Sequence, residues 1–472
     1  MAKERANSVR EQLTLFGEKK ITSGKATYFD RLTAVLKSDL NFHRQDSLYF
    51  SHNFHSFPAK FPPQLPKLFI NELTTPGDVV LDPMVGSGTT IVEAFLAGRK
   101  AIGFDIDPLA IKLSAVKTTP VNRKKLMKQW ENIYLRAQAD LTKNRDDLQN
   151  SLNSFFDPKT KAFVDYWFLP EIQLELFAIL QNIRDIKEDK IRNFFEVIFS
   201  SIIITKSGGV SLALDLGHTR PHKAKILLDK SGNVVFGEEY RDSARGKHVT
   251  KMIRSPLEEF EKKFHQTIKD ILVEDRHRIA PEIRFCDAQQ LCLTDETVDL
   301  IVTSPPYASN AIDYMRAHKF SLVWFGYSID DLTTQRKSYI GGESTTDYPF
   351  EAIPGFTSRK VSGISEIDPK KGNILRRYFT EMTGTLREMY RVLRPQKAAI
   401  VVVGSSVMKG IDTETHLCLA EIGEKIGFRV PYIGVRKLDR NKRMLPAGST
   451  TDLTSQIQKR MHEEYVIGFY KP

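Results

Sequence analysis

The sequence predicts an α/β fold, with a mostly parallel sheet covered by helices on both faces and interrupted by a long, mainly helical insertion. Three observations support this prediction. Short apolar stretches alternate with helical segments from residue 78, longer helical stretches replace them over residues 116–280, and the alternation resumes at Ile283. Such alternation is typical of strands joined by crossover helices. Because these sheets bind ligands beyond the carboxyl ends of their strands, we expect functional residues directly after strands.

The elements before the insertion are few. Residues 1–45 are basic and lack a clear period, which predicts a tail or loosely attached leader. The pattern then predicts a strand over Asp78–Leu81, a helix over Thr90–Ala97 and a strand over Ala101–Phe104. We assign residues 46–115 and 281–472 to one catalytic domain and residues 116–280 to the insertion.

The sequence of the insertion predicts helices on either side of a polar middle region. Apolar side chains recur on one face of Leu257–Leu272, as in an amphipathic helix, and Ile172–Ile186 and Phe194–Ile204 are also helical. Ile226–Phe236, with a Ser-Gly-Asn centre, predicts a hairpin.

After the insertion the strand rhythm returns. A helix is expected to open within residues 310–316 and to end near Gly326, and the Gly-, Ser-, Thr- and Pro-rich stretch Tyr327–Lys371 predicts a long loop. The expected strands are Ile283–Cys286, Leu300–Thr303, Ala399–Val403, Phe428–Val435 and Tyr465–Phe469.

Composition limits the possible functions. The chain has 472 residues, and its formal net charge of +11 favours a polyanionic partner. No apolar run reaches the roughly 18 residues that span a bilayer, and Met1–Lys20 has no signal-peptide core, so we expect a protein of a bacterial or archaeal cytoplasm. Three cysteines without zinc spacing predict reduced thiols, and His52 and His55 predict local hydrogen bonding, not a metal site.

A glycine-rich turn follows the first strand, with the sequence DPMVGSGTT over Asp82–Thr90. A phosphate-binding Walker loop would need a lysine after Gly88, and a dinucleotide fingerprint would need glycine where Ile91 stands. A turn that binds S-adenosylmethionine needs neither. Asp105, 17 residues past Gly88 at the end of the next strand, is placed to accept both ribose hydroxyls; Asp107 is the weaker candidate, with a helix N-cap as its structural role.

These motifs resemble those of the DNA amino-methyltransferases, which act on cytosine N4 or adenine N6. Asp82–Thr90 resembles the family's first motif, His55–Pro62 its segment over the methionine part of the cofactor, and Phe285–Ala288 its third-strand motif. The resemblance implies S-adenosyl-L-methionine as cofactor and the class I methyltransferase fold, a Rossmann-like, mostly parallel seven-stranded sheet. The implied cofactor residues are Phe57, Lys60, Phe61, Asp82, Pro83, Gly86, Ser87, Gly88, Thr89, Asp105, Ile106, Asp287, Ala288 and Thr303.

The stretch Val298–Tyr307, with the sequence VDLIVTSPPY, is an apolar strand that stops abruptly at two prolines and an aromatic residue. Prolines cannot continue a parallel ladder, so the tetrapeptide SPPY is expected to protrude as a stiff catalytic loop comprising Ser304, Pro305, Pro306 and Tyr307. A base amino group is a poor nucleophile because its lone pair is delocalised. The Ser304 hydroxyl and the Pro305 carbonyl can accept hydrogen bonds from its two protons, and Tyr307 offers a stacking face.

Serine at the first position of this loop resembles chiefly the cytosine-N4 members, so we favour cytosine N4, with adenine N6 second. Methylation of cytosine C5 requires a thiolate nucleophile, in its family presented after a proline. Cys286, Cys292 and Cys418 follow Phe, Leu and Leu, which argues against that reaction.

The expected substrate is double-stranded DNA with the target nucleotide flipped out, at a cost of a few kcal/mol. Tyr307, Tyr314 or Phe57 could stack against the extruded base, and the expected protein partner belongs to a restriction or phage-defence system. The insertion is the candidate DNA-recognition region, although in one known permutation of the family the recognition region lies between the third-strand motif and the catalytic loop. Candidate DNA-contacting residues are Arg220, His222, Lys223, Arg316, Lys319, Arg440 and Arg443.

Two other functions stay open at this point. Related Pro-Pro-Tyr loops act on planar amides, so RNA or a protein glutamine is an alternative substrate. A non-catalytic, cofactor-sensing DNA-binding module is the second alternative, although such a module has no need of Ser304 and Tyr307 together.

Overall fold

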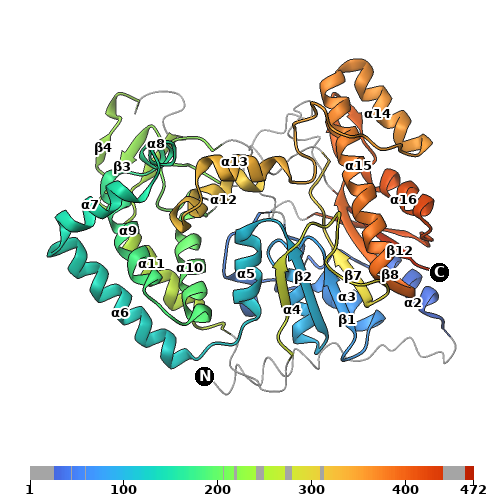
Figure 1. Cartoon of the computed structure of the whole chain (residues 1–472), viewed down its shortest axis with the longest axis horizontal. Helices are drawn as coiled ribbons and strands as arrows, with labels where there is room; N and C mark the ends of the chain where they lie inside the picture. The colour runs from blue at the N-terminus through green and yellow to red at the C-terminus, as the bar shows by residue number, and fades with distance from the viewer. Residues whose placement is uncertain are drawn as a thin grey trace.

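The computed structural model confirms the α/β class (Figure 1). It describes residues 26–43, 45–58, 60–205, 207–216, 221–240, 249–271, 279–308, 313–438 and 463–472. A seven-stranded sheet runs in the order β11-β12-β8-β7-β1-β2-β6. Its strands are β1 (Val79–Asp82), β2 (Lys100–Asp105), β6 (Glu282–Phe285), β7 (Val298–Thr303), β8 (Leu393–Gly404), β11 (Ile433–Lys437) and β12 (Glu463–Tyr470). β12 is antiparallel to both of its neighbours, and the other pairs are parallel.

Helices cover both faces of this sheet because its central strands are apolar on both sides. In β8, Ala399, Val401 and Val403 pack into the core on one face, and the alternate residues pack into the core on the other. The first face carries α14 (Gly355–Ile367), α15 (Pro369–Val392) and α16 (Thr415–Ile426); the second carries α2 (Tyr28–Leu36), α3 (Gln64–Leu73) and α4 (Thr89–Leu96).

The insertion forms a helical lobe beside the sheet (Figure 1). Its helices are α6 (Arg123–Thr142), α7 (Arg145–Phe155), α8 (Pro158–Trp167), α9 (Pro170–Arg184), α10 (Asp189–Ile203) and α11 (Pro256–Thr267), and a small sheet contains β3 (Ile226–Leu228), β4 (Val234–Phe236) and β5 (Thr250–Met252). β3 and β4 form the expected hairpin. The lobe shares one apolar core with α5 (Pro108–Thr118) and α12 (Tyr314–Leu322), so it packs directly against the domain that contains the sheet.

Two expectations about irregular segments were wrong. Within residues 1–45, α2 packs Leu32 and Leu36 into the sheet core, so residues 28–36 are not a loosely attached leader. The expected loop over residues 327–371 contains α13 (Ile329–Lys337), α14 and the start of α15. The polar composition of this segment does not indicate helices. The Ser328 side chain nevertheless caps α13 by accepting from the Asp331 backbone N–H, and α14 buries only Thr357, Val361 and Ile364.

Short elements complete the described chain: the 3₁₀ turns η1 (Phe50–Asn53), η2 (Glu238–Tyr240) and η4 (Val323–Phe325), and the paired β9 (Val407–Met408) and β10 (Ile411–Asp412). β11 starts at Ile433, five residues later than the strand predicted from Phe428. No helix among the described residues is long and apolar enough to cross a membrane, and none of their His, Cys, Asp and Glu side chains cluster as a metal site would require.

The expectation of three reduced thiols was also wrong. Cys286 and Cys292 are joined by a disulfide that closes the turn after β6, while Cys418 is free and buried under α14 and α15. The six-residue separation is short enough for the turn between them to bring the two thiols together, which a count of cysteines does not show.

Candidate functional site

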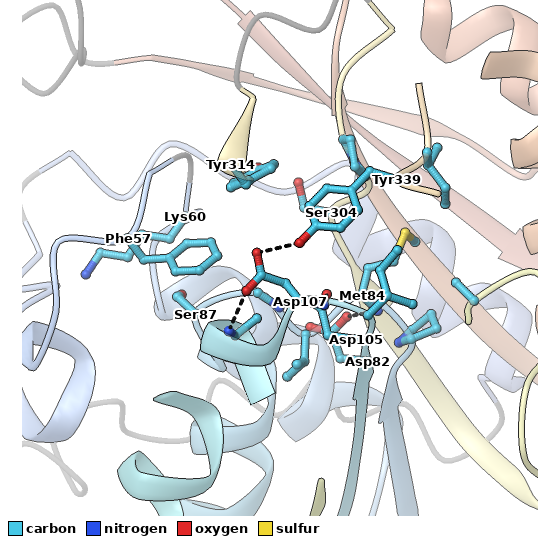
Figure 2. Close-up of a pocket in the computed structure, with 18 of the residues that line it drawn as sticks. Phe57, Lys60, Asp82, Met84, Ser87, Asp105, Asp107, Ser304, Tyr314 and Tyr339 are labelled. Atoms are coloured by element: carbon cyan, nitrogen blue, oxygen red, sulfur yellow. Dashed lines mark hydrogen bonds between the residues drawn. The ribbon is translucent and has the colours of Figure 1, made fainter. Parts of the chain in front are cut away.

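A cavity that opens to solvent lies at the carboxyl ends of β1, β2, β6 and β7. In Figure 2, Phe57 and Tyr314 lie toward one side of this cavity and Tyr339 and Met84 toward the other. It is lined by Phe57, Lys60, Phe61, Asp82, Pro83, Met84, Val85, Gly86, Ser87, Thr89, Asp105, Ile106, Asp107, Ala110, Cys286, Asp287, Ala288, Ser304, Pro306, Tyr314, Tyr339 and Ile340.

The glycine turn after β1 needs its glycines for two reasons. Gly86 and Gly88 have φ angles of +47° and +79°, in the left-handed region that favours glycine. A Cβ on Gly88 would also lie 2.8 Å from Ser114 Oγ and 3.1 Å from the Ser114 backbone on α5. The turn can therefore lie tightly against α5 and lead directly into α4, whose N-cap is Gly88.

Gly88→Ala should therefore lower both the melting temperature and the affinity for S-adenosylmethionine. The strained φ and the contact with α5 act on the same turn, and we expect a loss of about 1–3 kcal/mol in unfolding free energy. Thermal denaturation and calorimetric titration would measure the two effects. Gly98→Ala is the matched control for backbone strain alone, because Gly98 also has a positive φ but has open space around its Cβ position. An equal loss of affinity for S-adenosylmethionine in both variants would contradict the proposed role of Gly88 in the cofactor turn.

Asp105 ends β2 with its carboxyl group at the floor of the cavity. Its Oδ2 accepts from the Gly86 backbone N–H at 2.8 Å, and its Oδ1 accepts from the Asp107 N–H at 2.9 Å. Burial, followed by the charge of Asp107, raises the pKa of Asp105 to about 7. A partly buried carboxylate is thus held in place by the glycine turn and can accept further hydrogen bonds from hydroxyl groups.

Asp107 has a larger role in the structure than the N-cap considered from the sequence. It does cap α5, accepting from the backbone N–H groups of Leu109 and Ala110. Its Oδ2 also lies 2.5 Å from His318 Nδ1 and accepts from the Tyr339 hydroxyl at 2.9 Å. Burial opposes ionisation, but His318 and these hydrogen bonds together lower the pKa of Asp107, so a charged group lies beside Asp105.

The cofactor turn and the SPPY loop are directly connected. The Thr303 hydroxyl, at the end of β7, donates to Asp82 Oδ1 at 2.7 Å, and the Thr90 hydroxyl donates to the Val302 carbonyl at 3.0 Å. Burial raises the pKa of Asp82 to about 6. These bonds fix the position of Ser304, which follows Thr303 and faces the cavity.

Tyr307 lies just beyond this lining. Its hydroxyl donates to Glu464 Oε1 on β12 at 2.9 Å. Tyr314, the first residue of α12, lines the cavity and packs against Phe57 with ring centroids 5.6 Å apart. The cavity wall on this side is therefore aromatic.

The cavity brings together most of the residues expected from the sequence. Among the expected residues, Gly88, Thr303, Pro305 and Tyr307 do not line it: Gly88 begins α4, and Thr303 is fully buried against Asp82. Of the other lining residues, Asp107 was the weaker ribose candidate and Tyr314 a candidate for stacking, while Met84, Val85 and Cys286 lie within the two cofactor motifs. The sequence did not point to Ala110, Tyr339 or Ile340. Tyr339 and Ile340 fall in the segment expected to be a loop, where no motif pointed to them.

Several candidate DNA-contacting side chains have partners within the protein. Arg316 Nε lies 2.8 Å from Asp313 Oδ2, Lys319 Nζ lies 5.0 Å from the Phe163 ring centroid, and Lys223 Nζ lies 4.1 Å from that of Tyr166. His222 is exposed. Arg220, Arg440 and Arg443 lie outside the described residues.

The cavity fits S-adenosylmethionine by its chemistry. Asp105 and Asp287 supply carboxylates for hydroxyl and amino groups, while Met84, Ile106 and Ala288 supply an apolar wall of the kind that an adenine ring requires. This site, on a sheet whose one reversed strand lies next to the edge, defines a class I S-adenosylmethionine-dependent methyltransferase.

Comparison with known proteins agrees with this class. A family profile described as DNA methylase, of the N6/N4 type, matches residues 18–117. The chain is 26% identical over 443 residues to the Type II methyltransferase M.MvaI of Kocuria varians, covering 91% of this chain and 92% of that protein. It is 46% identical over 104 residues to the Type II methyltransferase M.BglI of Bacillus subtilis, covering 22% of this chain and 25% of that protein.

Among solved structures, a TehB-like SAM-dependent methyltransferase from Corynebacterium glutamicum aligns over 86% of this chain and 87% of its own, with a TM-score of 0.25 and 9% identity. These sequence matches make the chain similar to DNA amino-methyltransferases, through the N6/N4 DNA methylase profile over residues 18–117 and through the two Type II methyltransferases.

Proposed function

We propose that this protein transfers a methyl group from S-adenosylmethionine to N4 of a cytosine flipped out of duplex DNA. The observation that carries the proposal is the joint placement of Ser304 and Asp105 in one cavity, at the ends of β7 and β2. A group that binds the ribose and a group that holds the reacting amine thus face the same space.

Each part of the site has a distinct role in this proposal. S-adenosylmethionine supplies an activated methyl group when bound. Asp105 orients the ribose hydroxyls, and Asp287 accepts from the adenine amino group. The Ser304 hydroxyl and the Pro305 carbonyl accept hydrogen bonds from the two amino protons of the base, which localises the nitrogen lone pair. Orientation of this kind provides most of the rate, so a general base with a perturbed pKa is unnecessary.

The choice of cytosine N4 rests on Ser304. Serine stands at the position where adenine-N6 members of the family usually have Asp or Asn, so adenine N6 is the second candidate. In both cases a base within a duplex has to leave the stack to reach the cavity. Tyr314 lines the cavity and Tyr307 ends the SPPY loop, so both offer aromatic faces on which an extruded base can stack.

Mass spectrometry of nucleosides from DNA treated with the protein and S-adenosylmethionine tests this proposal. We expect N4-methylcytosine in duplex DNA and no methylation of RNA or of protein glutamine in parallel reactions. N6-methyladenine would support the second candidate. Product only in RNA or protein would reject DNA as the substrate.

DNA affinity should fall steeply as salt increases. The net charge of +11 includes many lysines and arginines in the insertion, which we propose as the DNA-recognition region, and each phosphate contact releases a counterion. Fluorescence anisotropy with a labelled duplex between about 50 and 200 mM salt should show a loss of at least about ten-fold. A flat response would remove the argument for phosphate contacts.

A further inference from the structure

The hydroxyl of Tyr307 belongs to a partly buried chain of contacts with residues outside the SPPY motif. Glu464 on β12 accepts from Tyr307 with one carboxylate oxygen, at 2.9 Å, and contacts the guanidinium of Arg436 with the other. Arg436 and Glu464 lie directly opposite each other on β11 and β12. They are only 7% and 8% exposed, so neither is a surface charge.

The reversed direction of β12 explains how Glu464 reaches this place. Parallel strands bring their carboxyl ends to the catalytic edge, whereas β12 brings its first residues there, and Glu464 pairs with Gly404 at the end of β8. β11 runs parallel to β8 and brings Arg436 to the same edge from its carboxyl end. The last two strands thus place an ion pair beside the loop that ends β7.

From this arrangement, we propose that Glu464, oriented by Arg436, is a positioning residue that holds the Tyr307 ring at the angle required to stack an extruded base. The inference rests on the proposed function and adds residues that no motif identified. Pro305 and Pro306 restrict the backbone before Tyr307, and Glu464 fixes the far end of its ring. With both ends held, little rotational freedom remains to be lost when a base arrives.

The electrostatics keep the tyrosine in the donor role. Burial, and then the charge of Glu464, raises the pKa of Tyr307 well above its ordinary value, so the hydroxyl stays protonated. A hydrogen bond whose acceptor is ionised is stronger than one between neutral groups. Arg436 occupies the second oxygen of Glu464 and so fixes the plane of the carboxylate that accepts from the Tyr307 hydroxyl.

The test compares Tyr307→Phe, Glu464→Gln and the double variant in single-turnover methylation. The substrate is a duplex carrying the methylation site of the wild-type protein, mapped beforehand by sequencing methylated DNA. We expect each single change to lower the rate about ten-fold, with KM for DNA and affinity for S-adenosylmethionine within about two-fold of wild type. The double variant should be no slower than the slower single variant, since both changes break one contact.

A spectroscopic measurement separates positioning from a general structural role. In a duplex with 2-aminopurine at the target position, the short-lived, stacked component of the fluorescence decay should shrink in Tyr307→Phe, although the base is still extruded. Tyr49→Phe is the matched control: Tyr49 donates to Glu93 Oε1 at 2.7 Å, the same type of contact outside the cavity lining, and its loss should leave rate and decay unchanged.

The outcomes distinguish this inference from the proposed function. A wild-type protein that methylates no DNA rejects the proposed function, and the inference falls with it. An active wild type together with a Tyr307→Phe variant of equal rate and equal decay overturns the inference alone. Additive losses of rate in the double variant would also overturn the inference. If Glu464→Gln unfolds the protein, the Tyr307→Phe variant alone tests the inference, because this variant leaves the Glu464–Arg436 pair intact.

Discussion

Ser304→Ala should lower the methyl-transfer rate by about 100-fold, the scale seen when one preorganised hydrogen-bonding group is removed from an active site. The hydroxyl lies at the cavity, on a loop held by Thr303 and Asp82. Its loss removes an acceptor for the amino protons, so the nitrogen lone pair stays delocalised. Single-turnover methylation of duplex DNA measures the rate.

Affinity for S-adenosylmethionine should change little in this variant, because Asp105 and the glycine turn are untouched. Ser304→Asn is the informative control: it restores a carbonyl acceptor in the form that the adenine-N6 members use, and it should recover part of the rate. A Ser304→Ala variant with the full wild-type rate would contradict the proposed role of the hydroxyl.

Asp105→Asn should weaken binding of S-adenosylmethionine by about 100-fold, because a charged acceptor of two hydroxyl groups becomes a neutral amide with one acceptor oxygen. The same change should raise the melting temperature at a mildly alkaline pH. Burial raises the pKa of Asp105 to about 7 in the fold, whereas an exposed aspartate titrates near about 4. The carboxylate therefore lowers stability while it provides binding.

The pH dependence follows from the same pKa. Between about pH 4 and about pH 7, Asp105 holds a proton in the folded state but has released it in the unfolded state. The free energy of unfolding therefore falls as pH rises through this interval. Above about pH 7 the loss in unfolding free energy is constant. Affinity for S-adenosylmethionine should conversely fall as pH drops below about 7. Calorimetry and thermal denaturation on either side of this pKa measure both effects. Asp146→Asn, at an exposed position on α7, should change neither the affinity for S-adenosylmethionine nor the melting temperature. An Asp105→Asn protein that binds S-adenosylmethionine with wild-type affinity would contradict the assignment of Asp105 to the ribose hydroxyls.

The sheet was predictable from the sequence because its strands alternate with helices and are apolar on both faces. Short runs such as Val298–Thr303 are completely buried, so their mostly apolar composition is enough to predict them as strands. The glycine turn and the acid that follows it were predictable because positive φ angles and a charge at a strand end limit the residues that fit. Asp105 reaches the cavity floor as expected.

Residues whose role depends on distant contacts were not predictable in this way. Tyr339 reaches Asp107 across 232 positions, and Glu464 reaches Tyr307 across 157. No local sequence motif identifies Tyr339 or Glu464. The helices α13 and α14 were not predicted because their sequences are mostly polar and each buries only a narrow face. The disulfide was missed because the turn after β6, not the number of cysteines, brings Cys286 to Cys292.

The proposed chemistry depends on one cavity that holds the cofactor with its methyl group facing the SPPY loop. A crystal structure of the protein with bound S-adenosylmethionine would reveal this arrangement without any kinetic inference. We predict both ribose hydroxyls on the carboxylate of Asp105 and the methyl carbon directed toward Ser304. A cofactor bound outside this cavity, or one whose methyl group points away from Ser304, would refute the proposed mechanism.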